Sequence, residues 1–127
     1  MLHAMLGIQD YNALLAHPVR GFSWEGLVVD QVLARLHPLA QASFFRTAKG
    51  DEADLVVEQG GKRYIAEIKA SATPKVEKGF WKVVEDLQPA HAAVVAPVDR
   101  ASTLQGRVDV MPLYRYIEQG RADGWLL

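Results

Sequence analysis

Asp54, Glu67 and Lys69 are residue types that can form a phosphodiesterase site with a divalent cation. They flank a Gly60-Gly61 pair, which between two strand-like runs is typical of a β-hairpin loop. Two carboxylates supply the hard oxygen ligands that magnesium and manganese prefer. A lysine ammonium beside them can orient a water molecule or stabilise developing negative charge. The chemistry requires the three side chains to converge, so the pairing of the two strands is decisive.

The register of the predicted hairpin brings the two acids together. If the glycines are the central loop residues, Gln59 pairs with Lys62 and, counting outward, Asp54 lies opposite Glu67. Directly opposed residues share a face, with Cβ atoms roughly 5 Å apart. Lys69 lies two residues beyond Glu67, so the pleat returns it to the same face. Like charges directly opposite one another destabilise a sheet, so this arrangement predicts a cation between the carboxylates.

A third acid is predicted to approach the same site from a preceding helix. Residues 23–37 read as a helix with Ser23 as its N-cap and Pro38 as its stop. Glu25 has the helical phase of the apolar residues at positions 29, 32 and 36, so we expect it on the buried stripe. A lone carboxylate is costly there without a partner, and we expect it to join the other two acids.

The order of these residues resembles the PD-(D/E)XK nuclease superfamily, which has the restriction-endonuclease-like fold. Glu25 lies in an opening helix, Asp54 on one strand, and Glu67-Ile68-Lys69 on the next. The resemblance implies that the acids at positions 25, 54 and 67 bind Mg²⁺ or Mn²⁺. It also implies that Lys69 helps to activate the attacking water and that DNA is the substrate.

More narrowly, three stretches look like the C-terminal domain of a prokaryotic family of AAA-type ATPases, a domain whose function is not established. The stretches are residues 17–26, 52–55 and 66–69, and the likeness extends from about residue 6 to the helix expected after residue 112. The chain has no Gly-rich phosphate loop of the Walker type. We therefore expect a detached domain, a truncated gene product or a fragment, with an ATPase or a second copy of itself as partner.

Composition narrows the class of protein. With 127 residues, half of them hydrophobic, the chain is expected to form one domain over residues 1–127. Residues 1–20 read as an N-terminal linker with a short helix capped by Asp10, and residues 21–120 as the core. The absence of cysteine excludes disulfides and thiolate metal sites. No secretory pattern and no apolar run of about 20 residues is seen, so we expect a cytoplasmic protein without membrane association.

The periodicity of the chain predicts an αβββαβ order with a further strand and helix at its C-terminal end. This order matches the restriction-endonuclease-like core, an α/β fold with a mixed sheet flanked by helices. Residues 98–107 lack a clear period and are expected to be a mobile loop. The remaining expected elements are strands at 43–47, 92–96 and 108–111 and helices at 76–87, ended by Pro89, and at 112–120.

Charge gives this chain no overall attraction to nucleic acid. Its 14 Lys and Arg residues face 15 Asp and Glu residues, for a net charge of −1, so any contact with DNA must be local. The candidates are Arg46, beside the site, and Lys78 and Lys82, which are spaced i, i+4 on one predicted helix. The alternatives are an edge-strand charge for Arg46 and a solvated helix face for the two lysines.

Two other functions fit the pattern. In the first, the domain is a noncatalytic nuclease-like module that docks onto an ATPase or another copy of itself and retains the acids for structure or weak metal binding. In the second, it binds single-stranded nucleic acid without metal, in a strongly salt-dependent way. A basic cleft around Lys69, Arg46 and Lys82 favours cleavage of DNA, whereas an apolar patch favours docking.

Overall fold

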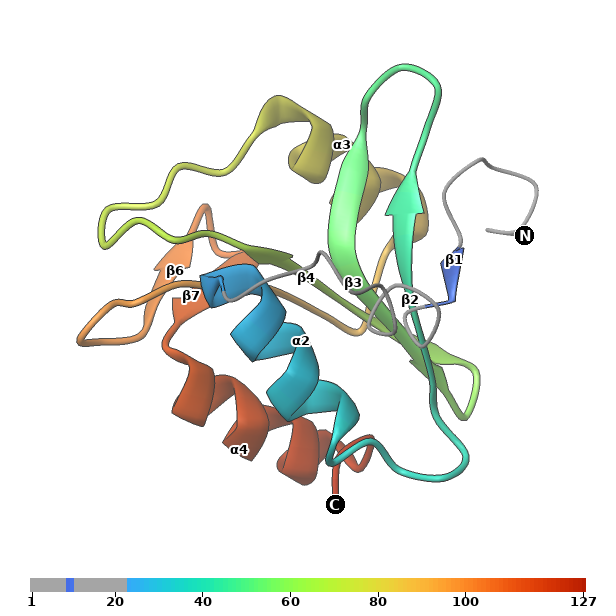
Figure 1. The fold of residues 1–127 in the computed structure, drawn as a ribbon. Coiled ribbons are helices and arrows are strands. Elements are labelled where there is room, and N and C mark those ends of the chain that lie inside the picture. Colours follow the sequence, from blue (N-terminus) through green and yellow to red (C-terminus); the bar gives the residue numbers. More distant parts are fainter. Residues whose placement is uncertain (1–8, 11–22) are drawn as a thin grey trace.

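A seven-stranded mixed sheet with helices on both faces forms the core of this chain (Figure 1). The structure, a computed structural model, describes residues 9–10 and 23–127. The strand order is β1-β2-β3-β4-β5-β7-β6, in which β4–β5 and β5–β7 are parallel and the other pairs antiparallel. The predicted class, a mixed sheet flanked by helices, is confirmed. The strands are β1 (Gln9–Asp10), β2 (Gln41–Arg46), β3 (Glu52–Gln59), β4 (Lys62–Ile68), β5 (His91–Val95), β6 (Ser102–Leu104) and β7 (Val108–Met111), and the helices are α2 (Trp24–Leu33), α3 (Lys78–Leu87) and α4 (Leu113–Asp123).

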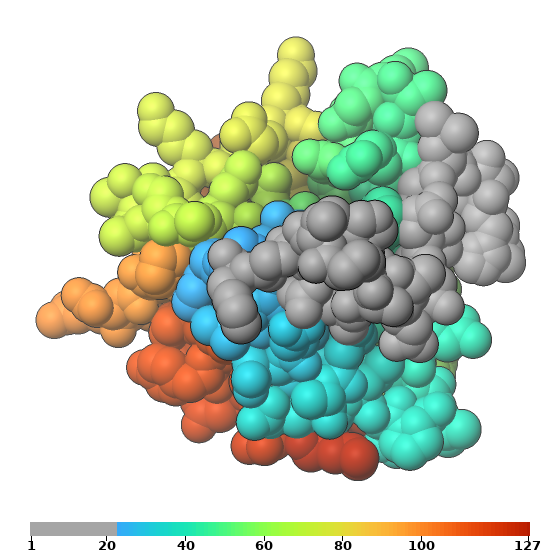
Figure 2. Space-filling view, in the orientation of Figure 1, coloured from blue at the N-terminus to red at the C-terminus, as the bar shows by residue number. Residues whose placement is uncertain are grey.

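Each face of the sheet has its own apolar core. Helices α2 and α4 cover one face, where Val28, Tyr116 and Trp125 are buried. Helix α3 covers the other face with Phe80 and Val83. Figure 2 shows the outer surface of α2 and α4 on the side toward the viewer. Because β5 lies between both cores, residues 92–95 are all buried, as their uninterrupted apolar sequence predicts.

The β3–β4 hairpin has the predicted register. Gly60 and Gly61 both adopt positive φ angles, +60° and +78°, which two-residue hairpin turns of this kind require. Gln59 pairs with Lys62, and the pairing continues in the same register to Leu55 and Ala66. Asp54 and Glu67 are the next residues beyond this last pair.

A β-bulge in β3, which the sequence did not predict, changes the direction of the strand at Asp54. Ser43 of β2 pairs with Val56, but Phe45 pairs with Ala53, so β3 carries one extra residue over this interval. Ala53 and Val56 consequently pack in the same core, although they are three residues apart. Bulges redirect side chains, and this one lies at the site residue.

Helix α2 begins where the sequence predicts and ends earlier. The Ser23 hydroxyl caps it by accepting a hydrogen bond from the Gly26 N–H at 3.0 Å. The helix ends at Leu33 and does not reach the predicted stop at Pro38. The following residues instead pair with the C-terminal segment: Leu36 forms a β-bridge with Leu126, and His37 is hydrogen bonded to the same segment. Contact with a distant part of the chain ends this helix.

Helix α4 is longer than predicted, because Gly120 serves packing rather than termination. The helix continues to Asp123 and ends at Gly124, whose φ of +86° gives the left-handed cap typical of helix C-termini. Gly120 is buried inside the helix, where a Cβ atom would lie 2.5 Å from the Leu126 side chain. The glycine thus allows the C-terminal segment to pack directly on the helix.

One further prediction, the mobile loop, is wrong. The segment 98–107 is not a structureless loop, because β6 pairs with β7 across a turn in which Gln105 and Gly106 have positive φ. Asp10 lies in β1 and pairs with Ser43, and the helix that it was predicted to cap falls on residues outside the described part of the chain. The rest of the predicted linker and short helix at residues 1–20 lies outside the described residues. No helix in the described part of the chain has the length and apolar character needed to cross a membrane.

Candidate functional site

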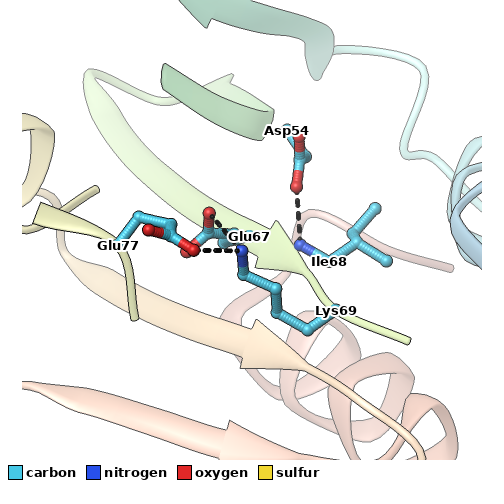
Figure 3. Close-up of polar contacts among 5 residues, drawn as sticks. All are labelled: Asp54, Glu67, Ile68, Lys69 and Glu77. Carbon is cyan, nitrogen blue, oxygen red and sulfur yellow. Dashed lines mark hydrogen bonds and ion pairs between the residues drawn. The ribbon is translucent and has the colours of Figure 1, made fainter. Parts of the chain in front are cut away.

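The candidate site lies where β3 and β4 part. The backbone pairing of these strands stops at Leu55 and Ala66. Beyond that point the Ile68 N–H donates to Asp54 Oδ2 at 2.8 Å, so a carboxylate replaces a strand as acceptor (Figure 3). Strand β4 continues alongside β5, and the Lys69 N–H donates to the Val95 carbonyl at 2.9 Å. The split holds Asp54 against the last residues of β4.

Glu67 is the one charged residue among the described residues that is buried, with 4% of its surface exposed. Its Oε1 atom lies 3.4 Å from Lys69 Nζ, while its Oε2 atom has no hydrogen-bond partner among the described residues. Burial raises the pKa of Glu67 to about 7; Lys69 opposes the rise and the nearby charge of Asp54 adds to it. A buried carboxylate oxygen without a donor is costly, so it indicates a missing partner.

Asp54 is electrostatically coupled to Glu67 and titrates close to it. Burial raises the pKa of Asp54 to about 6, against the effect of the Ile68 N–H, and repulsion from Glu25 and Glu52 adds to the rise. Two carboxylates with raised pKa values beside a lysine are typical of a functional site. Lys69 contacts Glu67, whereas Asp54 directs one oxygen to the backbone of β4 and acts on Glu67 through its charge. The convergence of all three side chains stays a prediction.

Glu77 belongs to the site and was not found from the sequence. It is exposed at the N-cap position of α3, and its Oε1 atom lies 3.3 Å from Lys69 Nζ (Figure 3). Burial works to lower the pKa of Lys69, but ion pairing with Glu67 and Glu77 outweighs it and holds the pKa above its usual value. The signal in the sequence is weak: a single acid just before the helix that follows the Glu-x-Lys strand.

Glu25 is exposed, which corrects its predicted burial. A hydrogen bond from Trp24 Nε1 to the Val95 carbonyl, 3.5 Å long, ties the first turn of α2 to the end of β5. Glu25 is thereby near enough to raise the pKa of Asp54. A first-turn residue can share the phase of a buried stripe and still reach water, because the helix there extends to the rim of the sheet.

A cleft of about 410 Å³ opens beside Glu67, between the β2–β3 turn and the start of α3. Of the three predicted nucleic-acid contacts, only Lys78 lines it. Arg46 is paired with Glu52 at 3.0 Å and Lys82 with Asp86 at 3.2 Å, both on exposed surface. The cleft is lined by Gly50, Glu52, Glu67, Lys69, Glu77, Lys78, Gly79 and Phe80.

The described residues fit a cation held by two carboxylates rather than by three. They contain no group of three or more His, Cys, Asp or Glu side chains arranged to hold a metal ion, so the predicted three-acid set is not formed. Magnesium is commonly bound through one or two carboxylates, with water and substrate phosphate completing its shell. Asp54 and Glu67 are the two candidate ligands here, and Glu67 Oε2 is buried without a hydrogen-bond partner among the described residues.

Fold and site together define a mixed α/β domain with a carboxylate pair and a lysine where two strands part. The chain belongs to the family described as "Domain of unknown function (DUF4143)", which matches residues 20–116. This family is known as a C-terminal domain in proteins associated with AAA ATPases, as the narrower resemblance predicts. Membership of the nuclease superfamily stays a prediction.

Two mycobacterial proteins are similar to nearly the whole chain. They are the uncharacterized protein Rv2008c of Mycobacterium tuberculosis and the uncharacterized protein Mb2031c of Mycobacterium bovis, each 37% identical over 123 residues. The match covers 97% of this chain and 28% of either relative, so the chain spans little more than a quarter of their length. No solved structure matches the chain.

Proposed function

We propose that this domain hydrolyses phosphodiesters, with DNA as substrate, using a divalent cation held by Asp54 and Glu67. The observation that carries the proposal is the Glu67 carboxylate, which is buried beside Asp54 and Lys69 with one oxygen unpartnered among the described residues. Burying an unpartnered carboxylate is costly, and a bound cation would offset that cost. The predicted cofactor is therefore Mg²⁺ or Mn²⁺.

The order of elements supports a nuclease-like core. Helix α2, the antiparallel strands β2 to β4, helix α3 and the parallel strand β5 follow one another in the αβββαβ order. The superfamily resemblance implies an acid on one strand and a Glu-x-Lys segment on the next, and the candidates are Asp54 on β3 and Glu67-Ile68-Lys69 at the end of β4. The fold alone does not specify an activity, so the proposal depends on the site.

Each side chain has a role in the proposed reaction. A bound divalent cation lowers the pKa of water and polarises a phosphoryl oxygen. Asp54 and Glu67 hold that cation, and the Ile68 N–H fixes the orientation of the Asp54 carboxylate. Lys69 orients the attacking water or stabilises the negative charge that develops on the phosphate. Glu77 keeps the Lys69 ammonium at the mouth of the cleft.

Titration calorimetry with manganese tests the metal site directly. We expect the wild-type chain to bind Mn²⁺, Asp54→Asn to lose at least tenfold in affinity, and Asp99→Asn, which removes an exposed loop carboxylate, to bind as the wild type does. The titration is repeated with a short DNA duplex, because substrate phosphate completes many such sites. Absence of binding by the wild type under both conditions would overturn the proposal.

Lys69→Ala separates metal binding from catalysis. Because Lys69 acts on the water and the phosphate, we expect this variant to keep its manganese affinity within a few-fold and to cleave a duplex at least about 100-fold more slowly. A gel assay with radiolabelled duplex measures the rate. A wild-type rate in Lys69→Ala would contradict its catalytic role.

A second candidate function is docking onto an ATPase partner or a second copy of the domain. The length of the relatives favours it, because the matched 123 residues make up 28% of each of them. A docking module needs no cation. Wild-type protein that binds no manganese with or without DNA, while it associates with itself or an ATPase in sedimentation experiments, would favour this candidate.

A further inference from the structure

The cleft beside Glu67 contains the start of a helix with free hydrogen-bond donors. Helix α3 has ten residues, and its N-cap, Glu77, makes no side-chain capping hydrogen bond. The Phe80 and Trp81 N–H groups both donate to the Glu77 carbonyl. The N–H groups of Lys78 and Gly79 come before them, where a helix has no internal acceptors. They carry the positive end of the helix dipole, which favours an anionic ligand.

The Glu77 side chain leaves this helix end open because Lys69 engages it. An N-cap side chain ordinarily accepts from the helix N–H groups. Here Glu77 Oε1 lies 3.3 Å from Lys69 Nζ instead, and Lys78 is among the residues that line the same cleft. No ion pair with another described residue engages the Lys78 ammonium. The cleft therefore offers backbone and side-chain donors together.

Gly79 brings the start of α3 close to the β2–β3 turn. A Cβ atom at this position would lie 3.0 Å from Asp51 Cα and 3.4 Å from the Gly50 carbonyl oxygen. Any larger residue would push the helix away from the turn. The glycine thus lets the start of α3 approach the β2–β3 turn, and both line the same cleft as Glu67.

Glu67 supplies an independent sign of a ligand in the same cleft. Its side chain is 6% exposed, and its Oε2 atom has no partner among the described residues. A carboxylate attracts a cation, whereas the helix end and Lys78 attract an anion. A divalent cation together with a phosphate group that binds to it would satisfy both the carboxylate and the hydrogen-bond donors.

The charges of the cleft make the cation a requirement for the phosphate. Two ammonium groups, Lys69 and Lys78, face three carboxylates, Glu52, Glu67 and Glu77. A free anion therefore meets no net attraction in the cleft. Once a divalent cation has neutralised the acids where β3 and β4 part, the positive charge of Lys78 and of the α3 N-terminus dominates the electrostatic potential of the cleft.

We propose that the cleft is a phosphodiester subsite, in which the oxygens of the substrate phosphate accept hydrogen bonds from Lys78 and from the N–H groups at the start of α3. The inference rests on the proposed cation site, because phosphate binds only after the cation. It assigns the phosphate contact to Lys78 and not to Arg46 or Lys82, whose charges are used in ion pairs on the surface.

The test measures binding of dimethyl phosphate and of inorganic phosphate by ³¹P relaxation in the presence of protein and Mn²⁺. Manganese affinity is measured first by calorimetry for each variant. We expect wild-type protein with Mn²⁺ to bind dimethyl phosphate, and Lys78→Ala to bind it about tenfold more weakly with unchanged manganese affinity. Lys62→Ala, which removes an exposed lysine at the hairpin loop, should bind both ligands as the wild type does.

The outcomes separate the two proposals. No manganese binding would overturn the cation site and this subsite with it. Manganese binding with equal dimethyl phosphate affinity in wild type and Lys78→Ala would overturn the subsite and leave the proposed function standing. Binding of inorganic phosphate but not of dimethyl phosphate would overturn the diester assignment in favour of a monoester. Dimethyl phosphate binding without manganese would overturn the required order of binding.

Discussion

Asp54 and Glu67 are the two residues on which the site depends, and their energies are linked. Each is a carboxylate whose burial raises its pKa, to about 6 and about 7 respectively, and the charge of Asp54 adds to the cost of ionising Glu67. Without a cation, the folded chain retains protons that the unfolded chain releases. Ionisation of the two acids therefore lowers the stability of the cation-free domain, and a bound cation would offset that loss.

We expect the stability of the cation-free domain to fall as the pH rises. The pKa of Glu67 is raised from an ordinary 4.5 to about 7, so the folded state binds more protons than the unfolded state between these values. The stabilisation is fully present below about pH 4.5 and is lost as the pH passes 7. Its size is on the order of 2–3 kcal/mol between pH 5 and pH 8. Urea unfolding at both pH values with a chelator present measures it.

Glu67→Gln isolates the contribution of this carboxylate. The amide is close in shape but does not titrate, so we expect the difference in unfolding free energy between pH 5 and pH 8 to shrink by most of that amount. Glu118→Gln, which changes an exposed carboxylate on α4, should leave the difference as in wild type. An equal pH dependence in wild type and Glu67→Gln would show that Glu67 ionises as freely when folded as when unfolded.

At the scale of elements, the site forms where strands β3 and β4 stop pairing with each other. The hairpin pairing ends one residue before the acids, at Leu55 and Ala66, and the irregularity in β3 accompanies the hydrogen bond of Asp54 with the Ile68 N–H. Strand β5 keeps β4 in the sheet after β3 has left it. Helices α2 and α3 meet this split from opposite faces, with Trp24 and Glu77 as their contacts.

Gly120→Ala tests the packing of the C-terminal segment on helix α4. Alanine is the better helix former by about 1 kcal/mol, yet its Cβ would lie 2.5 Å from Leu126 Cδ1 and 3.0 Å from Trp125 Cζ2, both in buried residues. Overpacking of this kind costs about 1–3 kcal/mol. We therefore expect a net loss of unfolding free energy of up to about 2 kcal/mol in denaturant titrations.

An exposed position on the same helix provides the control for Gly120→Ala. Glu118→Ala introduces the same residue without a clash, so we expect its stability to lie within about 0.5 kcal/mol of wild type. If Gly120→Ala were more stable than wild type, the C-terminal segment would have to move away from α4 at little cost. That result would contradict the close packing of Leu126 on the helix.

At the scale of the whole molecule, charge limits how the domain can hold DNA. The net charge is −1, and the exposed Arg46 and Lys82 are neutralised by acids beside them. The overall charge therefore gives no general attraction to a phosphate backbone. Affinity for DNA must come from the cation and a few local donors, and a larger basic surface must be supplied by another chain or domain if tight binding is needed.

We accordingly expect a shallow salt dependence of duplex binding. With about two phosphates contacted by cationic side chains, the logarithm of the affinity should fall with the logarithm of salt concentration with a slope near −2. The affinity would then drop about tenfold between 50 and 200 mM salt. Fluorescence anisotropy with manganese present measures the slope, and a gel checks that the duplex stays intact. A slope near −6 would reveal an extended basic surface instead.

The sequence by itself determined the local features of this protein. Two glycines specified the hairpin and its register, short apolar runs specified the strands, and the periodicity of residues 76–87 specified helix α3. These follow from the sequence because turn chemistry and side-chain periodicity act between neighbours in the chain. The hairpin register also placed Glu67 and Lys69 at the end of one strand and Asp54 on its neighbour, for the same reason.

Tertiary structure decided the features that depend on contacts between distant segments. The C-terminal segment ended α2 early and made Gly120 a packing residue. The bulge in β3 redirected Asp54, the start of α3 brought Glu77 to Lys69, and the rim position of Glu25 exposed it. Neither burial nor a raised pKa is a property of a residue alone, because both depend on which segments exclude water from it.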